Sequence, residues 1–354
     1  MSKRSIWGFL LLCVLATQSC IKDAPLNPEA DIETFEIAAT QLTGDVFIDQ
    51  INRTITLNLT KEAYENGVSP TLTLSTGASV SPASGTLISL AGEDVSYEVT
   101  SASGENKKIY TVKVLNVGNW SFDFENWQTH PTDMYGFPVE ENGVQLWSSG
   151  NPGVALSGVP ARPDAYPTRS TSDGYLGTRA AEMVTIKGTV LSEFIGIRLF
   201  AGSLFLGNFN ASQALLNPLA ATEFGEPYIG LPDRFTGYYK YAAGPEFINR
   251  EGQVQPGVKD QCTIYAVLYS GTTRLNASNI MTSDRVIARA ELPDGNDKAD
   301  FTKFDIPFVY REGASTDGNM MMAIVASSSA QGDSYMGAIG SRLVVDSLTI
   351  VPKL

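Results

Sequence analysis

The sequence predicts an all-β protein that consists of a small β-sandwich followed by a larger one. Three observations indicate this class: short runs in which apolar and polar residues alternate, 32 glycines beside a charged fraction of only 18%, and no amphipathic helical pattern of ordinary length. Alternation with a period of two places every second side chain on the same face, as in half-buried antiparallel strands. Abundant aromatic and β-branched residues also favour strands over helices.

Residues 1–19 predict a lipoprotein signal peptide. Met1–Arg4 is basic, and Ile6–Ala16 is an apolar stretch too short to cross a bilayer as a mature helix. We expect Cys20 to become the lipidated first residue, although Thr17–Ser19 departs from the usual lipobox. Ordinary secretion with cleavage nearby is the alternative. Ile21–Asp23 resembles the export signal of Bacteroidetes surface lipoproteins, which implies anchoring in the outer membrane, facing the extracellular side.

Charge and composition restrict the partners and the chemistry. The net charge of −13 argues against nucleic acid and anionic lipid surfaces, so we expect membrane contact only through the lipid on Cys20. His130 is the single histidine and cannot build a multi-histidine metal site. Cys262 lies in a strand pattern and is interpreted as a buried apolar residue rather than a nucleophile. Catalysis by paired carboxylates stays open.

The stretch 20–30 is polar with prolines and predicts a tether, and 31–117 predicts the small sandwich. Its alternating segments are Ile32–Ile37, Asp45–Asp49, Thr54–Leu59, Thr71–Leu74, Val95–Val99 and Ile109–Val114. The pattern of Ser81–Gly85, Val95–Thr100 and Ser103–Val114 resembles the immunoglobulin-like domains of Bacteroidetes surface lipoproteins. This resemblance implies a spacer module.

Residues 118–354 predict the large sandwich, and its size fits a jelly-roll-type arrangement. The strand candidates are Met183–Ile186, Ser203–Leu206, Arg234–Tyr241, Cys262–Tyr269, Arg285–Leu292, Phe301–Ile306, Met320–Ala326 and Leu343–Val351. Within Arg234–Tyr241, one face carries Phe235, Tyr239 and Tyr241 and is expected in the core. Ser148–Arg179 is rich in Gly, Pro, Ser and Arg and predicts a long irregular connection, where binding surfaces tend to lie.

This larger region resembles the Putative carbohydrate metabolism domain (PCMD) family of Bacteroidetes lipoproteins. The motifs that carry the resemblance, in chain order, are Phe122–Trp127, Tyr166–Thr168, Asp173–Ala181, Gly202–Phe209, Pro232–Tyr241 and Gly340–Leu348. The resemblance implies a β-sandwich like that of carbohydrate-binding modules and a role in glycan handling. It implies no catalytic residue, and catalytic residues are unassigned.

A glycan site needs exposed aromatic rings for the C–H faces of sugars and polar side chains for their hydroxyls. The candidates near turns and in the long connection are Trp127, Trp147, Tyr166, Tyr175, Arg162, Arg169 and Asp173. For each aromatic residue, the alternative is a ring packed over the edge of the sandwich. No cofactor is expected to be required for such binding.

A structural calcium ion is a further hypothesis, based on Glu125 in an early strand and Asp346 within the last apolar run. First and last strands often pair in such sandwiches, and calcium prefers hard oxygen ligands. The alternatives are a solvated Glu125 and an Asp346 that caps a neighbouring turn.

Three functions remain open from the sequence. The first is a surface-anchored lipoprotein that captures extracellular carbohydrate without catalysis, together with other surface glycan-uptake proteins. The second is a glycoside-active enzyme with paired carboxylates. The third is a purely structural or adhesive surface protein, which would expose apolar patches instead of a polar site.

Overall fold

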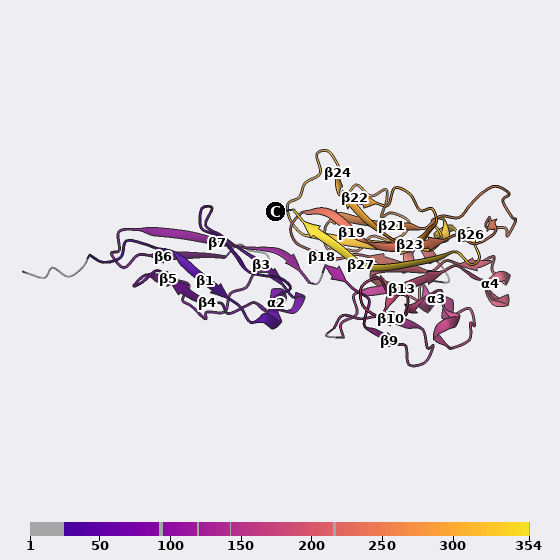
Figure 1. Cartoon of the computed structure of the whole chain (residues 1–354), viewed down its shortest axis with the longest axis horizontal. Coiled ribbons are helices and arrows are strands. Elements are labelled where there is room, and N and C mark those ends of the chain that lie inside the picture. Colours follow the sequence, from indigo (N-terminus) through magenta and orange to yellow (C-terminus); the bar gives the residue numbers. More distant parts are fainter. Residues whose placement is uncertain (1–24, 92–94, 119, 142, 215–216, 354) are drawn as a thin grey trace, which may run out of the picture. The chain divides into compact units, whose positions relative to one another are not determined.

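The computed structural model describes residues 25–91, 95–118, 120–141, 143–214 and 217–353 (Figure 1). The predicted signal peptide and Cys20 lie outside the described residues. The chain forms two compact units: the first takes most of the described residues up to Lys113, and the second takes Val114 onward with Thr40–Asp45 and Leu57–Tyr64. The domain limits that the sequence indicates, 31–117 and 118–354, stay a prediction.

The N-terminal region is a small sandwich, as predicted. Strand β1 (Ile32–Glu36) pairs with β4 (Thr71–Leu74). A five-stranded sheet has the order β2 (Phe47–Asp49), β3 (Thr54–Leu59), β7 (Lys107–Val117), β6 (Val95–Thr100) and β5 (Ser79–Ser81). The short helices are η1 (Ala39–Gln41) and α2 (Lys61–Asn66). The rings of Phe35 and Tyr97 meet edge to face in the core, with centroids 5.7 Å apart.

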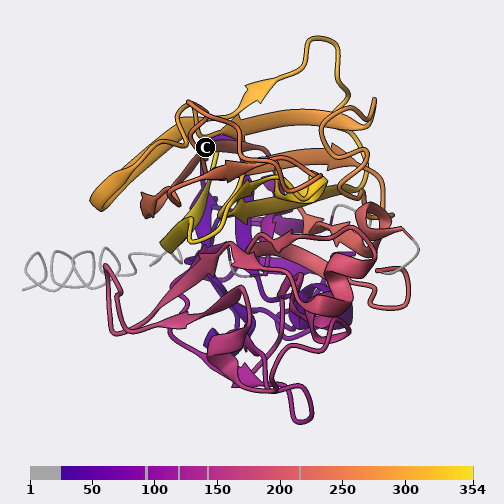
Figure 2. The same ribbon diagram turned by 90° about the vertical axis from the view of Figure 1, so that its right-hand side faces the viewer.

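The larger region is a sandwich of two mainly antiparallel sheets (Figure 1). The eight-stranded sheet has the order β11 (Trp147–Ser149), β16 (Ser203–Phe209), β25 (Met320–Ser327), β21 (Thr263–Ser270), β22 (Val286–Glu291) and β24 (Val309–Tyr310), with β17 (Thr222–Phe224) on β16 and β18 (Glu226–Tyr228) on β25. The six-stranded sheet has the order β12 (Thr168–Thr171), β13 (Ala180–Val184), β27 (Arg342–Pro352), β19 (Pro232–Ala242) and β23 (Lys298–Pro307), with β8 (Ser121–Phe122) on β27. Figure 2 shows the same fold after a turn of 90°; the last strand, β27, drawn in yellow, pairs with β13 and β19 within the six-stranded sheet.

Smaller elements connect the sheets. Three two-stranded pairs are β9 (Trp127–Thr129) with β10 (Gly136–Pro138), β14 (Ile186–Lys187) with β15 (Leu199–Phe200), and β20 (Phe247–Ile248) with β26 (Gly337–Ala338). The helices are α3 (Asn151–Ala155), η2 (Pro163–Ala165), α4 (Val190–Phe194), α5 (Pro218–Ala221) and η3 (Gly332–Ser334). The connection expected to be irregular over Ser148–Arg179 therefore contains α3 and β12. No described helix is long and apolar enough to cross a membrane.

The main core lies between the two sheets, and the alternation in the sequence predicts it well. Phe235, Tyr239 and Tyr241 on β19 are all buried there, as expected. Cys262 is 4% exposed, and burial raises the pKa of its thiol to about 12, so it is the inert buried residue that the sequence indicates.

The eight-stranded sheet is apolar on both faces, which positions the candidate site. Strands β16, β21 and β25 are buried almost continuously instead of at every second residue. One set of alternating side chains, including Leu204, Ile264 and Ile324, belongs to the main core. The intervening set on the opposite face, which we call the outer face, includes Phe205 and Val325 and forms a second apolar cluster. Such double-sided burial requires that other segments cover the outer face.

Candidate functional site

A groove of about 370 Å³ lies on the outer face of the eight-stranded sheet. Its floor is formed by β16, β21 and β25. Its walls come from helix α3, from 197–201, from 277–281 and from Ser329–Tyr335. This volume lies in the range of pockets that hold small ligands. None of the residues proposed from the sequence as glycan-binding lines this groove.

One end of the floor carries a row of hydroxyl groups, which we call the hydroxyl row. Ser203 on β16 and Thr263 on β21 both lie opposite Ser327 on the intervening strand β25. Neighbouring strands are about 4.8 Å apart, so the three hydroxyls cross the floor at regular intervals. The Ser203 Oγ accepts a bond from the Gly150 N–H (3.2 Å), and the Ser327 Oγ donates to the Ser329 carbonyl (3.0 Å). These bonds fix both serine side chains.

The next row along the strands is aromatic, apolar and acidic. Phe205 and Tyr265 lie opposite Val325, and Tyr265 lies opposite Glu291 on β22. Burial raises the pKa of Tyr265, and the negative charges of Asp333 and Glu291 raise it further. The phenol therefore stays a neutral hydrogen-bond donor near neutral pH. Among the described lining residues, Glu291 and Asp333 are the only charged ones.

The opposite end of the groove, which we call the apolar end, is formed by Phe209, Leu219, Ala277, Ile280 and Met281. Phe209 lies opposite Thr222, and the Ala277 N–H donates to the Leu219 carbonyl at 3.2 Å. Gly153 on helix α3 allows the Phe209 ring to approach, because a Cβ at this position would lie 3.0 Å from the ring.

A buried carboxylate fixes the wall beside the hydroxyl row. Asp260 is 2% exposed, and its Oδ2 accepts bonds from the Ser329 hydroxyl (2.6 Å), the Ala338 N–H (2.8 Å) and the Ser341 hydroxyl (2.7 Å). Its Oδ1 accepts from the Gln261 N–H (2.9 Å). Gly332 lets the turn of η3 lie against Ala201, since a Cβ there would come within 2.3 Å of the alanine methyl group. The groove is therefore built on a fixed frame.

Two of the predicted ligand-stacking rings are buried, which corrects their assignment. Trp147 is 1% exposed and packs edge to face against Phe122 and Phe124, at centroid distances of 5.0 and 5.2 Å. Tyr166 is also 1% exposed, and its hydroxyl donates to the Asp133 carbonyl at 2.7 Å. Neither ring can present a face to a ligand. Trp127 stays partly exposed, and its indole N–H donates to the Phe124 carbonyl at 2.7 Å.

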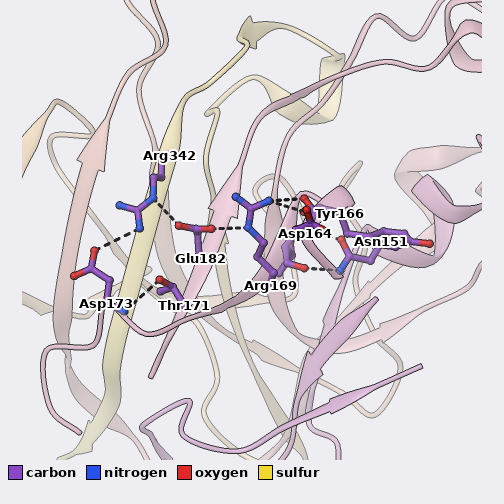
Figure 3. A network of polar contacts seen from close by, with 9 residues as sticks. Asn151, Asp164, Tyr166, Arg169, Thr171, Asp173, Glu182 and Arg342 are labelled. Atoms are coloured by element: carbon purple, nitrogen blue, oxygen red, sulfur yellow. Dashed lines mark hydrogen bonds and ion pairs between the residues drawn. The ribbon is translucent and has the colours of Figure 1, made fainter. Parts of the chain in front are cut away.

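The predicted polar residues are joined in ion pairs instead (Figure 3). Arg169 and Arg342 both bind the carboxylate of Glu182, at 2.5 and 2.6 Å, and Arg342 also reaches Asp173 at 3.4 Å. The bond from Lys240 lowers the pKa of Asp173. Arg162 pairs at the surface with the carboxylate of Asp164 at 2.9 Å, and the Asp164 carbonyl accepts a bond from Arg169, also at 2.9 Å. Arg169, Glu182 and Arg342 lie on the six-stranded sheet, not on the sheet that forms the groove floor.

Tyr175 is the most exposed of the predicted aromatic residues, with an exposed fraction of 44%. It stacks on Tyr238 of β19 with centroids 3.8 Å apart and planes inclined by 20°, and Phe301 lies 5.6 Å from it. The structure thus brings Tyr175 and Asp173 to the six-stranded sheet, but apart from the groove.

The two carboxylates of the calcium hypothesis both hold the loop that carries Tyr175. Asp346 is fully buried, and its Oδ2 accepts from the N–H groups of Tyr175 (2.7 Å) and Leu176 (3.1 Å). Glu125 accepts from the N–H groups of Thr178 and Arg179, both at 2.9 Å, and from the Thr178 hydroxyl. Burial raises the pKa of Asp346. Burial also acts to raise the pKa of Glu125, but these hydrogen bonds outweigh it, and the net pKa is lowered.

These contacts match the alternative in which Asp346 caps a neighbouring turn. Among the described residues, no three His, Cys, Asp or Glu side chains form a group that could hold a metal ion. The calcium ion stays a hypothesis with a direct test. Because N–H and O–H donors already occupy these oxygens, we expect EDTA to leave the melting temperature unchanged. A fall in melting temperature that calcium restores, but magnesium does not, would instead support a calcium ligand role for Glu125 and Asp346.

Sequence reasoning missed the groove residues, although a signal for them exists. Ser203 and Thr263 are the first residues of their strands, and Ser327 is the last of its strand. A hydroxyl residue at the end of each of three apolar runs indicates a polar row only once the strand order is known. In the structure β25 lies between β16 and β21, and this strand order cannot be read from the sequence.

Comparisons with known proteins cover both parts of the chain. The family model described as Putative carbohydrate metabolism domain matches residues 123–351, and the model described as SGBP, N-terminal matches residues 32–114. A crystal structure of a putative glycoside hydrolase from Bacteroides thetaiotaomicron is 33% identical, with 94% of this chain and 99% of that chain covered and a TM-score of 0.64. Another, from Bacteroides vulgatus, is 34% identical, with 66% of this chain and 98% of that chain covered and a TM-score of 0.61. No curated protein matches this chain.

Proposed function

Because the chain belongs to the Putative carbohydrate metabolism domain family, we propose that it binds an extracellular glycan non-covalently in the groove of the eight-stranded sheet. Family membership gives the protein a carbohydrate-associated role. The observation that carries the proposal is the hydroxyl row beside Tyr265, Glu291 and Asp333 in a single groove. A sugar offers hydroxyl edges to such a row and C–H faces to the neighbouring rings.

We place this binding at the cell surface. The match of residues 32–114 to the SGBP N-terminal model supports a surface location, and the predicted lipid on Cys20 would supply the anchor. Through this anchor the protein would hold extracellular carbohydrate close to the outer membrane, where other glycan-uptake proteins would receive it. Contact with the bilayer would need no further segment.

A glycan array, followed by calorimetry on the glycan that binds, tests the proposal. Thr263→Val removes one hydroxyl from the hydroxyl row at nearly constant shape. We expect it to weaken binding by about two- to tenfold, the effect of one lost hydrogen bond. Thr302→Val, on strand β23 of the other sheet, is the matched control and should bind as the wild type does. An array without any bound glycan would refute the proposal, and equal weakening by both variants would refute the position of the site.

A glycoside-active enzyme is the second candidate, favoured by one observation. Glu291 and Asp333 line the same groove, and their charges both act on the Tyr265 hydroxyl. Two carboxyl groups on opposite sides of a glycosidic bond are what glycoside hydrolysis requires. Product analysis on the bound glycan separates the two functions. Release of reducing ends that Glu291→Gln or Asp333→Asn abolishes would replace binding with hydrolysis.

A further inference from the structure

The chemical character of the groove changes along its length. On β16, the residues that face the groove run from Ser203 through Phe205 to Phe209. The cross-strand partners change in the same direction, from Ser327 to Val325. Six residues of extended strand span about 20 Å, which is longer than one sugar ring, so a ligand that touches both the hydroxyl row and the apolar end must carry a further group beyond the sugar.

Among the described residues, the apolar end offers no free side-chain partner for the hydroxyl groups of a sugar. The side chains of Phe209, Leu219, Ala277, Ile280 and Met281 contain no oxygen or nitrogen atom. Among the described lining residues, the polar side chain beside them is that of Thr222, whose hydroxyl already donates to the Leu219 carbonyl (3.1 Å) and accepts from the Ala277 N–H (3.2 Å). A sugar ring placed here would lose hydration of its hydroxyls without new hydrogen bonds, which costs free energy for each of them.

An apolar substituent of a ligand, unlike a sugar, would gain free energy at the apolar end. The apolar end adjoins the outer cluster, in which Phe205 and Phe224 pack edge to face with centroids 5.0 Å apart. Phe209, Ala277 and Met281 pack against this cluster but are only partly buried themselves. A ligand ring or alkyl chain laid on them would remove their remaining apolar surface from water.

We propose that the ligand of the groove is a glycoside whose sugar carries an apolar aryl or alkyl substituent. The sugar lies on the hydroxyl row beside Tyr265, and the substituent lies at the apolar end against Phe209. This inference rests on the proposed glycan binding and specifies its ligand class: a substituted glycoside and not an unsubstituted polysaccharide chain.

The experiment compares matched ligands by calorimetry on the full chain without its signal peptide. The probes are 4-nitrophenyl glycosides of glucose, galactose, mannose and xylose, each against the methyl glycoside of the same sugar and anomer, with 4-nitrophenol alone as a further probe. For the sugar that binds, we expect the nitrophenyl glycoside to have at least a tenfold lower Kd than the methyl glycoside. We expect 4-nitrophenol alone to bind more weakly than the nitrophenyl glycoside.

Two variants locate the substituent. Phe209→Ala removes the ring at the apolar end, and Ala277→Leu fills the space beside it. Both should reduce the preference for the nitrophenyl glycoside to about threefold or less and leave the Kd of the methyl glycoside unchanged. Phe301→Ala, on β23 of the six-stranded sheet, is the matched control and should retain the full preference. Thermal melts of each variant confirm that the fold is kept.

The outcomes separate the two proposals. Equal affinity for methyl and nitrophenyl glycosides would overturn the inference while glycan binding stands. A preference that persists unchanged in both Phe209→Ala and Ala277→Leu would overturn it as well, because the substituent would then lie elsewhere. Binding of 4-nitrophenol as tight as that of its glycosides would mean that the sugar contributes nothing, and together with an array without bound glycan it would overturn the proposed function itself.

Discussion

Asp260→Ala is expected to lower the free energy of unfolding by about 4 kcal/mol. Three buried donors, from Ser329, Ala338 and Ser341, share one oxygen of this carboxylate. A buried donor left without its acceptor costs about 1–3 kcal/mol, and the two hydroxyls can turn to recover part of this. Denaturant unfolding measures the change directly. In a thermal melt, the corresponding shift is roughly 10 °C for a domain of this size.

Asp300→Ala is the control, because Asp300 is exposed on β23 and its side chain has no hydrogen bond among those of the described residues. Its effect should stay within about 0.5 kcal/mol. Asp260→Asn retains one acceptor oxygen and should lie between the two. A change below 1 kcal/mol for Asp260→Ala would show that the three donors find other acceptors and that the wall of the groove does not depend on this carboxylate.

Trp147→Ala is expected to cost about 3–5 kcal/mol, the range of large aromatic truncations in a core. The side chain is 1% exposed and has Phe122 and Phe124 against it, so its removal leaves a cavity between packed rings. Equilibrium unfolding of Trp147→Ala and of Trp127→Ala gives a matched comparison, since Trp127 is only partly buried. We expect the larger loss for Trp147→Ala. Equal losses would contradict the assignment of Trp147 to the core.

The strands could be predicted from the sequence because each one encodes its own alternation. Phe235, Tyr239 and Tyr241 share a face by spacing alone, and this face is buried in the structure. The pairing of β8 with β27 also follows the expectation that first and last strands meet. The period of apolar residues depends only on residues close together in the sequence, so it indicates a strand without knowledge of the tertiary structure.

The site could not be predicted in the same way, because exposure depends on distant segments. Trp147 follows a turn-rich stretch and was predicted to be exposed. In the structure, Phe122 of β8 and the nearby Phe124 pack against its ring. Conversely, the runs around Phe205, Tyr265 and Val325 were predicted as strands, and nothing in their pattern indicated a groove. A strand that contributes one face to a core and the other to a groove is apolar throughout, so periodicity cannot distinguish it from a strand buried on both sides.

In the eight-stranded sheet, the residues that line the groove are different from those that pack in the main core. On β16, β21 and β25, one set of alternate positions packs in the main core, whereas positions such as Ser203, Thr263 and Ser327 line the groove. Selection can therefore exchange groove residues in related proteins without repacking the interior. Homologues with one scaffold could in this way diverge toward different ligands, and an engineer could retarget the groove by changing every second residue of three strands.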